Sequence, residues 1–190
     1  SSQHLLIIGG STHRGEEALL LECVAKLKSS PEPPRLVIAP RDINRTNEIQ
    51  TLALDYGFSV TFTSSGLMTD SEVIIVDSLG ELAALYAQCD IAFVGGSLVA
   101  QGGHNPIEPA IHGKPVIFGT HMEDFQEIAT DLTMSGGAFQ VNNKAQLCKI
   151  LERLLYDHDA RNTAGIQAKS CIIARQGVIH KHIKLIETLL

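Results

Sequence analysis

Short apolar runs alternate with amphipathic segments along nearly the whole chain. The runs at residues 4–8, 36–39 and 91–94 are almost entirely apolar, which is typical of strands that are buried on both faces of a parallel sheet. Between the first two runs, Glu16–Lys28 places apolar side chains at helical spacing. This alternation predicts an α/β domain with a doubly wound, mainly parallel sheet of about six strands and helices on both faces.

The length of 190 residues suits one domain that spans residues 1–190, because domains usually contain about 100–200 residues. The sequence shows no internal repeat and no low-complexity tract. After residue 141 we expect three helices, the first with Leu147, Leu151 and Leu154 on one face.

The net charge, the length of the apolar runs and the cysteine spacing indicate which classes of protein this chain does not resemble. The formal net charge of −6 disfavours broad adhesion to nucleic acid or to a membrane surface. No run reaches the roughly 18 apolar residues of a membrane span, so direct membrane insertion is not expected. Cys23, Cys89, Cys148 and Cys171 are widely spaced and form no CxxC pair. We interpret them as buried thiols of a protein from a reducing compartment.

Polar and glycine-rich segments follow several of the predicted strands, at residues 9–15, 40–45, 77–81 and 95–108. In an open parallel sheet, ligands bind outside the carboxyl ends of the strands. These segments are therefore the candidate ligand site, and each also has a purely structural explanation.

The segment at residues 9–15, GGSTHRG, joins the first strand to the first helix. Its small residues allow backbone N–H groups to approach an anion at a helix N-terminus, and a tight βα turn is the structural alternative. It lacks the GxGxxG spacing of dinucleotide-binding folds. It is not a phosphate-binding P-loop either, because Glu16 stands where that motif requires lysine.

The next two segments carry isolated polar side chains. Pro40 has no N–H and ends the second strand, so Arg41 is presented at the ligand edge. There Arg41 either contacts a base or a phosphate or is a solvated loop arginine. Ser78 and Glu81 have the spacing of a capping box, with Ser78 as N-cap, which explains both residues without a ligand.

Residues 95–109, GGSLVAQGGHNPIEP, form the most unusual stretch, with four glycines and two prolines. Asn105 is a good N-cap, Pro106 a good first helical residue, and Glu108 a capping-box acid. A cap does not require two Gly-Gly pairs, which suggest backbone that passes close to a ligand. We expect a ligand role for this stretch, with Glu108 accepting hydrogen bonds from ribose hydroxyls.

The histidines at positions 13, 104, 112 and 121 match no ligand spacing such as HExxH, so no metal site is expected. The sequence also lacks a GxSxG nucleophile elbow.

Two stretches of this sequence resemble the glycine-rich motif of bacterial 3-deoxy-D-manno-octulosonic acid (Kdo) transferases of lipopolysaccharide synthesis: FVGGSLV at residues 93–99 and GGHNPIEPA at residues 102–110. The resemblance spans nearly the whole chain. Shorter matches occur in the order of the family: STH at residues 11–13, GEE at 15–17, APR at 39–41, and GEL at 80–82 ahead of Tyr86.

The resemblance implies a GT-B glycosyltransferase, in which two Rossmann-like domains face each other across a cleft. This chain resembles the C-terminal domain, which binds the donor CMP-Kdo. The absent N-terminal domain would hold the lipid A acceptor, a membrane anchor and the catalytic glutamate base. We therefore expect no catalytic residue in this chain, and binding of CMP without turnover. The full-length protein would act at the cytoplasmic face of the inner membrane, whereas this fragment would be soluble.

The same resemblance assigns site residues. It implies nucleotide contacts at Pro40, Arg41, Leu79, Gly80, Glu81, Asn105, Pro106, Ile107 and Glu108. It implies candidate contacts to the phosphate or to the Kdo carboxylate at Ser11, Thr12, Gly95, Gly96 and Ser97. The sequence departs from the family at Arg14, usually glutamate, at Leu79, usually methionine, and at residues 42–44, usually His-Pro-Glu.

The implied reaction is inverting transfer of Kdo from CMP-Kdo to a hydroxyl of lipid A. The departing CMP gains negative charge, which Arg41 and N–H groups at helix N-termini can stabilise without a metal or another cofactor. Two alternatives fit the same residues: a GT-B transferase that uses a UDP-sugar, and a stand-alone nucleotide-binding module.

Overall fold

A parallel sheet forms the centre of the fold, in the strand order β3-β4-β2-β1-β5-β6-β7. The structure, a computed structural model, describes residues 4–65 and 71–187. The predicted doubly wound parallel sheet is confirmed, but it has seven strands where six were expected, because both short edge segments pair with a neighbour. The strands are β1 (Leu6–Thr12), β2 (Arg35–Pro40), β3 (Val60–Phe62), β4 (Val73–Ile75), β5 (Ile91–Val94), β6 (Val116–Phe118) and β7 (Ala138–Gln140).

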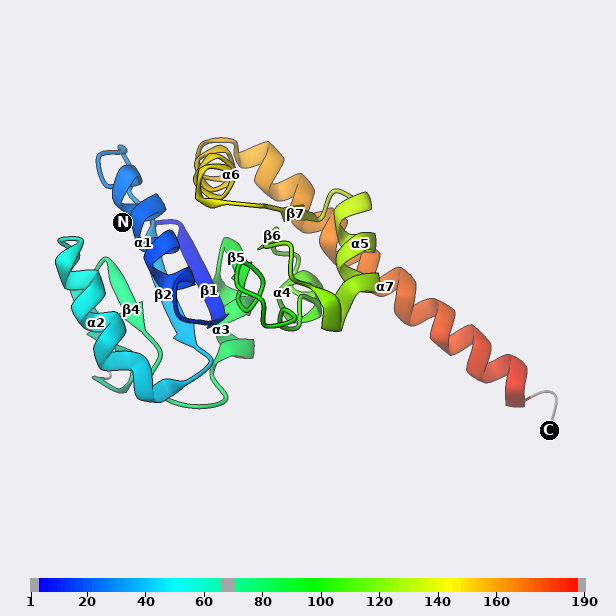
Figure 1. Cartoon of the computed structure of the whole chain (residues 1–190). Helices are drawn as coiled ribbons and strands as arrows, with labels where there is room; N and C mark the ends of the chain where they lie inside the picture. Colours follow the sequence, from blue (N-terminus) through cyan, green and yellow to red (C-terminus); the bar gives the residue numbers. More distant parts are fainter. Residues whose placement is uncertain (1–3, 66–70, 188–190) are drawn as a thin grey trace.

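Seven α-helices alternate with or follow these strands in the described part of the chain. They are α1 (Glu16–Leu27), α2 (Thr46–Asp55), α3 (Leu82–Gln88), α4 (Ile107–Ile111), α5 (Gln126–Met134), α6 (Lys144–Tyr156) and α7 (His158–Glu187). Two helices rather than the expected three close the chain, because α7 continues for 30 residues and extends away from the sheet (Figure 1). No helix within residues 4–65 and 71–187 combines the length and apolar character needed to cross a bilayer.

Alternate side chains of the strands build separate cores on the two faces of the sheet. On one face, Ile7 and Ile38 belong to a core that includes residues of α1, α2 and α6. On the other face, Ile8 and Val37 pack with residues of α3, while the core beside β6 includes residues of α4, α5 and α7. Each fully buried side chain of this size contributes about 1.5–3 kcal/mol. Burial on both faces explains why the strands are continuously apolar.

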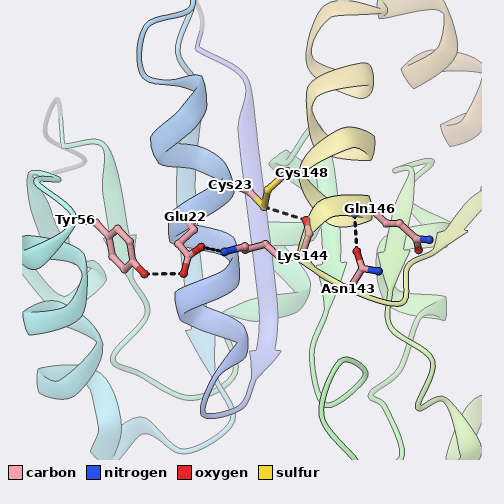
Figure 2. The surroundings of a disulfide bond; sticks show 7 residues. All are labelled: Glu22, Cys23, Tyr56, Asn143, Lys144, Gln146 and Cys148. Atoms are coloured by element: carbon pink, nitrogen blue, oxygen red, sulfur yellow. Dashed lines mark hydrogen bonds and ion pairs between the residues drawn. A yellow bond between two sulfur atoms is a disulfide. The ribbon is translucent and has the colours of Figure 1, made fainter.

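A disulfide between Cys23 of α1 and Cys148 of α6 joins two helices on the same face of the sheet (Figure 2). Their Cα atoms lie 4.9 Å apart although 125 positions separate them in sequence. The expectation of four thiols is therefore wrong for this pair, because sequence spacing does not report that α1 packs beside α6. Cys89 and Cys171 are free.

Polar contacts flank this disulfide. Lys144 at the start of α6 donates to the Glu22 carboxylate of α1, and the Tyr56 hydroxyl donates to the same carboxylate at 3.0 Å (Figure 2). One acidic side chain thus joins α1 to α6 and to the end of α2.

Candidate functional site

The four candidate segments meet at one edge of the sheet. Strands β4, β2, β1 and β5 are adjacent and parallel, so their carboxyl ends lie side by side. The segments at residues 40–45, 77–81 and 95–108 lie at the ends of β2, β4 and β5. The segment at residues 9–15 was predicted to follow the first strand but begins inside it, because β1 continues to Thr12. The topology therefore confirms that these segments meet at one edge of the sheet, and a ligand site there stays a prediction.

A cavity of about 130 Å³ opens at this edge. It is lined by Ser11, Ala39, Pro40, Arg41, Ile43, Val76, Ser78, Leu79, Gly80 and Leu82. Leu79 is 79% exposed, so this wall offers an apolar surface that the protein itself does not cover. Sites that enclose a small molecule usually measure about 300–1,000 Å³. The cavity therefore suits one part of a ligand and one wall of a larger cleft.

The backbone of β1 is strained at the residue that lines the cavity. Ser11 has a φ of 53°, the one positive φ of a non-glycine residue among the residues described. The pairing of β1 with β2 shifts register between Gly10 and Thr12, and such a bulge redirects a side chain. A strained backbone of this kind costs about 1–3 kcal/mol and is found most often at functional sites. Ser11 lines the cavity as a result, whereas Thr12 is buried.

The capping-box interpretation of Ser78 and Glu81 is wrong. Helix α3 begins at Leu82, and Gly80 has a φ of 87°, which a helix cannot contain. The Ser78 hydroxyl oxygen is buried and has no hydrogen-bond partner among the described residues. Glu81 is exposed and makes no side-chain cap bond. An unpaired hydroxyl in a residue that lines the cavity is available to a ligand, because buried polar groups are otherwise nearly always bonded.

Arg41 is exposed at the cavity, and its N–H donates to the Thr12 carbonyl at 3.0 Å. The residues after it are explained by local structure. Asp42 accepts a hydrogen bond from the Asn44 N–H at 3.0 Å and so begins a 3-10 turn over Ile43–Arg45.

Arg14 and Arg45, which lie near the cavity in sequence, form ion pairs with glutamates. Arg45 pairs with Glu17 at 2.8 Å, and the two side chains are 16% and 1% exposed. The Glu17 and Glu48 carboxylates raise the pKa of Arg45 against the opposing effect of its burial. Arg14 pairs with Glu48 at 2.7 Å on the surface. Neither arginine lines the cavity.

A buried carboxylate that sequence analysis missed organises the glycine-rich stretch. Glu16 is fully buried, and its Oε2 accepts from the N–H of His13 at 2.9 Å and of Gly96 at 2.8 Å. Its Oε1 accepts from the N–H of Ser97 at 3.0 Å and of Leu98 at 2.9 Å. The same position that excludes a P-loop thus holds the first and fourth segments together.

The backbone N–H groups of residues 95–97 have partners within the protein, and the contacts of these residues with the phosphate or the Kdo carboxylate stay a prediction. The N–H groups of Gly96 and Ser97 are bonded to Glu16, and that of Gly95 donates to the Gly10 carbonyl at 2.8 Å. A Cβ on Gly95 would lie 2.2 Å from the Ser11 carbonyl oxygen. Glycine is needed at this position for close packing on β1 rather than on a ligand.

The predicted cap at the start of α4 is displaced by one residue, although the Asn105 side chain still bonds to the first turn. The side-chain Oδ1 of Asn105 accepts from the Ile107 N–H at 3.0 Å, and the side-chain Nδ2 of Asn105 donates to the Glu108 carboxylate at 3.2 Å. Helix α4 begins at Ile107, so Pro106 takes the N-cap position. Residues 105–108 lie at the same sheet edge as the cavity but do not line it.

Tyr86 of α3 lies between Glu108 and the first strand. Burial raises the pKa of its phenol, with smaller contributions from Cys89 and Glu108. Its hydroxyl would lie 1.9 Å from a Cβ on Gly10, so Gly10 leaves room for this ring. In the sequence, Tyr86 stands out only as part of the family match, and its contact with β1 was not predictable from spacing.

A larger cavity, of about 360 Å³, lies between α5 and the ends of β6 and β7. It is lined by none of the predicted site residues, and its one charged lining side chain is Glu123. Hydrogen bonds from its own N–H and from His121 lower the pKa of Glu123, which keeps this carboxylate ionised. A negatively charged nucleotide is therefore better suited to the smaller cavity beside Arg41.

Within residues 4–65 and 71–187, no group of three or more His, Cys, Asp or Glu side chains is arranged to hold a metal ion.

Comparison with known proteins gives a consistent result. No protein-family model matches the chain. The chain is 34% identical to the 3-deoxy-D-manno-octulosonic acid transferase of Haemophilus influenzae over 183 residues. This aligned region covers 95% of this chain and 43% of the relative. The enzyme of the same name from Aquifex aeolicus is 34% identical over 149 residues, 78% of this chain and 41% of the relative. The chain therefore spans less than half the length of these curated relatives.

Solved structures agree with the sequence relatives. The C-terminal CMP-Kdo binding domain of WaaA from Acinetobacter baumannii matches with a TM-score of 0.84 and 26% identity, covering 90% of each chain. The Anabaena protein HepE in complex with UDP-glucose matches with a TM-score of 0.69 and 16% identity, covering 99% of this chain and 49% of that chain. At this identity the second match shows the shared fold alone.

Proposed function

The chain belongs to the family of 3-deoxy-D-manno-octulosonic acid (Kdo) transferases, and we propose that it is the donor-binding domain of such an enzyme, which holds CMP-Kdo at the carboxyl edge of its sheet. The proposal depends mainly on one observation. Ser11, Pro40, Arg41 and the Leu79–Gly80 turn, which come from three separate segments of the chain, line one cavity at that edge.

The chemistry of this cavity suits a cytidine nucleotide. Leu79 supplies exposed apolar surface for a base, and the unpaired Ser78 hydroxyl can bond to its polar edge. Arg41 supplies a cation for the phosphate, and a guanidinium matches phosphate oxygens in geometry as well as charge. Glu108, held by Asn105, would accept hydrogen bonds from the ribose.

We assign the rest of the reaction to a second domain, the acceptor domain of a two-domain transferase. Inverting transfer requires a base on the opposite side of the sugar from the leaving CMP, and we assign that base, the lipid A acceptor site and the membrane anchor to the acceptor domain. The exposed cavity of about 130 Å³ supports this division, because a second domain can close over it. We place the complete enzyme at the cytoplasmic face of the inner membrane.

In this proposal no cofactor takes part in the transfer step. Charge that develops on the departing CMP is stabilised by Arg41 and by protein hydrogen-bond donors fixed in advance, which is the most effective form of electrostatic stabilisation. Donor binding without turnover is the activity expected of the chain alone.

Calorimetric titration of the chain with CMP and with UMP tests the proposal. We expect CMP to bind and UMP to bind more weakly. Arg41→Ala and Glu108→Ala should each weaken CMP binding about ten-fold or more, because a hydrogen bond to a charged group contributes about 1.5–3 kcal/mol.

Two matched variants serve as controls. Arg14→Ala removes an arginine that pairs with Glu48 outside the cavity, and Glu123→Ala removes a glutamate from the larger cavity. Both should bind CMP as the unmodified chain does. Absence of CMP binding at about millimolar concentration would contradict the proposal, and tighter binding of UMP would favour a UDP-sugar transferase.

A further inference from the structure

Two histidines from different loops contact each other at the ligand edge. His13 follows β1 and His104 precedes α4, and their Nε2 atoms lie 2.8 Å apart. Their rings are parallel to within 8°, with centroids 5.1 Å apart. This distance is that of a hydrogen bond, in which one Nε2 donates and the other accepts.

This contact limits the charge of the pair. A histidine that carries two ring protons can only donate from Nε2, so two such rings cannot face each other at 2.8 Å. While the hydrogen bond is intact, the pair is neutral or carries a single positive charge. A second proton can enter only when the two rings separate or when an acceptor comes between them.

The charged groups around the pair act in both directions. Burial, His13 and Arg41 lower the pKa of His104, in that order, and Asp124 raises it. On the His13 side, the Glu16 carboxylate accepts the His13 backbone N–H at 2.9 Å. Burial, the neighbouring ring and Arg41 therefore disfavour a second positive charge on the unliganded pair, against the opposing effect of Asp124.

The backbone holds this pair in place. Glu16 bonds the N–H groups of His13 and Gly96, and the Gly96 carbonyl in turn accepts the Gly103 N–H at 2.9 Å, next to His104. A Cβ on Gly96 would lie 3.1 Å from the His104 ring. The two rings thus meet because of a fixed network and not because of a chance surface contact.

We propose that His13 and His104 are phosphate-binding residues and that the arriving phosphate breaks their shared hydrogen bond, so that each ring donates to a phosphate oxygen and the pair takes up a proton from solvent. The inference deepens the proposed function and rests on it. A dianionic phosphate beside Arg41 reverses the local field and supplies acceptors for both rings. The positive charge of the site would then be completed by ligand binding.

Proton uptake during nucleotide binding tests this directly. Titrations of CMP at about pH 7.5 in two buffers with different ionisation enthalpies count the protons, since a phosphate monoester has already lost its second proton there, with a pKa of about 6. Cytidine, which lacks the phosphate, is the ligand control. His13→Gln and His104→Gln remove the pair, and His121→Gln, a histidine paired with Glu123 instead, is the control variant.

We expect the unmodified chain and His121→Gln to take up close to one proton with CMP and none with cytidine. Because each bound proton changes affinity up to ten-fold per pH unit, CMP affinity should also fall as pH rises. The His13 and His104 variants should lose the uptake and bind CMP about ten-fold or more weakly, with cytidine binding unchanged.

Other results separate the two hypotheses. Binding of CMP and cytidine with no proton uptake would overturn this inference and leave the proposed function standing. Uptake that persists in both variants would also overturn it. Absence of binding for both ligands would overturn the proposed function and this inference together. The comparison of CMP with cytidine uses the unmodified chain and does not depend on whether a variant folds.

Discussion

Replacement of Glu16 by glutamine tests the role of the buried carboxylate. The Glu16 side chain is fully buried, and each of its oxygens accepts two backbone N–H groups at 2.8–3.0 Å. Glutamine keeps one acceptor oxygen and places an amide NH₂ group where the other oxygen stood. Two backbone N–H groups then face a donor, and two charge-assisted hydrogen bonds are lost.

The expected loss of stability follows from those two bonds. Each hydrogen bond to a charged group contributes about 1.5–3 kcal/mol, so Glu16→Gln should lower the free energy of unfolding by about 3 kcal/mol or more. This is a large part of the roughly 5–15 kcal/mol that stabilises a typical domain. Because the loops at residues 9–15 and 95–98 are joined through this carboxylate, CMP binding should weaken as well.

Urea unfolding followed by circular dichroism measures this effect, since the chain contains no Trp for fluorescence. Glu48→Gln is the matched control, because Glu48 is 44% exposed and forms ion pairs at the surface. Such pairs contribute about 0–1 kcal/mol. If Glu16→Gln costs no more than Glu48→Gln, the view that Glu16 fixes the two loops is incorrect.

Three further measurements address the fold. Gly95→Ala should destabilise the chain by about 1–3 kcal/mol or more and weaken CMP binding, because the new Cβ would lie 2.2 Å from the Ser11 carbonyl oxygen; unchanged urea unfolding would contradict this packing. Reduction of the disulfide, which closes a separation of 125 residues, should cost about 2–5 kcal/mol, and equal melting temperatures with and without dithiothreitol would show that it is not formed in solution. The Ser64 hydroxyl bond lowers the pKa of Asp77. A carboxyl with a folded pKa below its unfolded value stabilises the protein above about pH 4 and loses this effect as pH falls, so Asp77→Asn should make stability less dependent on pH in acid, and an unchanged acid profile would exclude this role.

The sheet and the meeting of the candidate segments at one edge were predictable because they depend on local sequence. Strands such as β5 are apolar throughout and end at glycine, and parallel strands must bring their carboxyl ends to one edge. The segments beginning at Pro40 and Leu79 therefore met in one cavity as expected. The hydrogen bond from Ile107 to Asn105 was equally local.

The features that sequence analysis missed depend on contacts between distant residues. Glu16 bonds to Gly96 across 80 positions, and His13 contacts His104 across 91. The Cys23–Cys148 disulfide spans 125. No spacing rule reports such pairs, so the contacts of Gly95 and Gly96 with residues 11–16 were not predictable from the sequence.

The capping box failed for a different reason. Ser78 and Glu81 have the correct spacing, but Gly80 adopts a φ of 87° and delays the start of α3 to Leu82. Glycine permits this conformation without requiring it, so the sequence alone does not distinguish a cap from a turn that lines a cavity.

A crystal structure of this chain with CMP tests the central claim most directly. We predict the base against Leu79 and Pro40, the phosphate at Arg41 with the two histidine rings separated, and the ribose near Glu108. Density for CMP in the larger cavity, between α5 and β7 and beside Glu123, would contradict the assignment of the donor site.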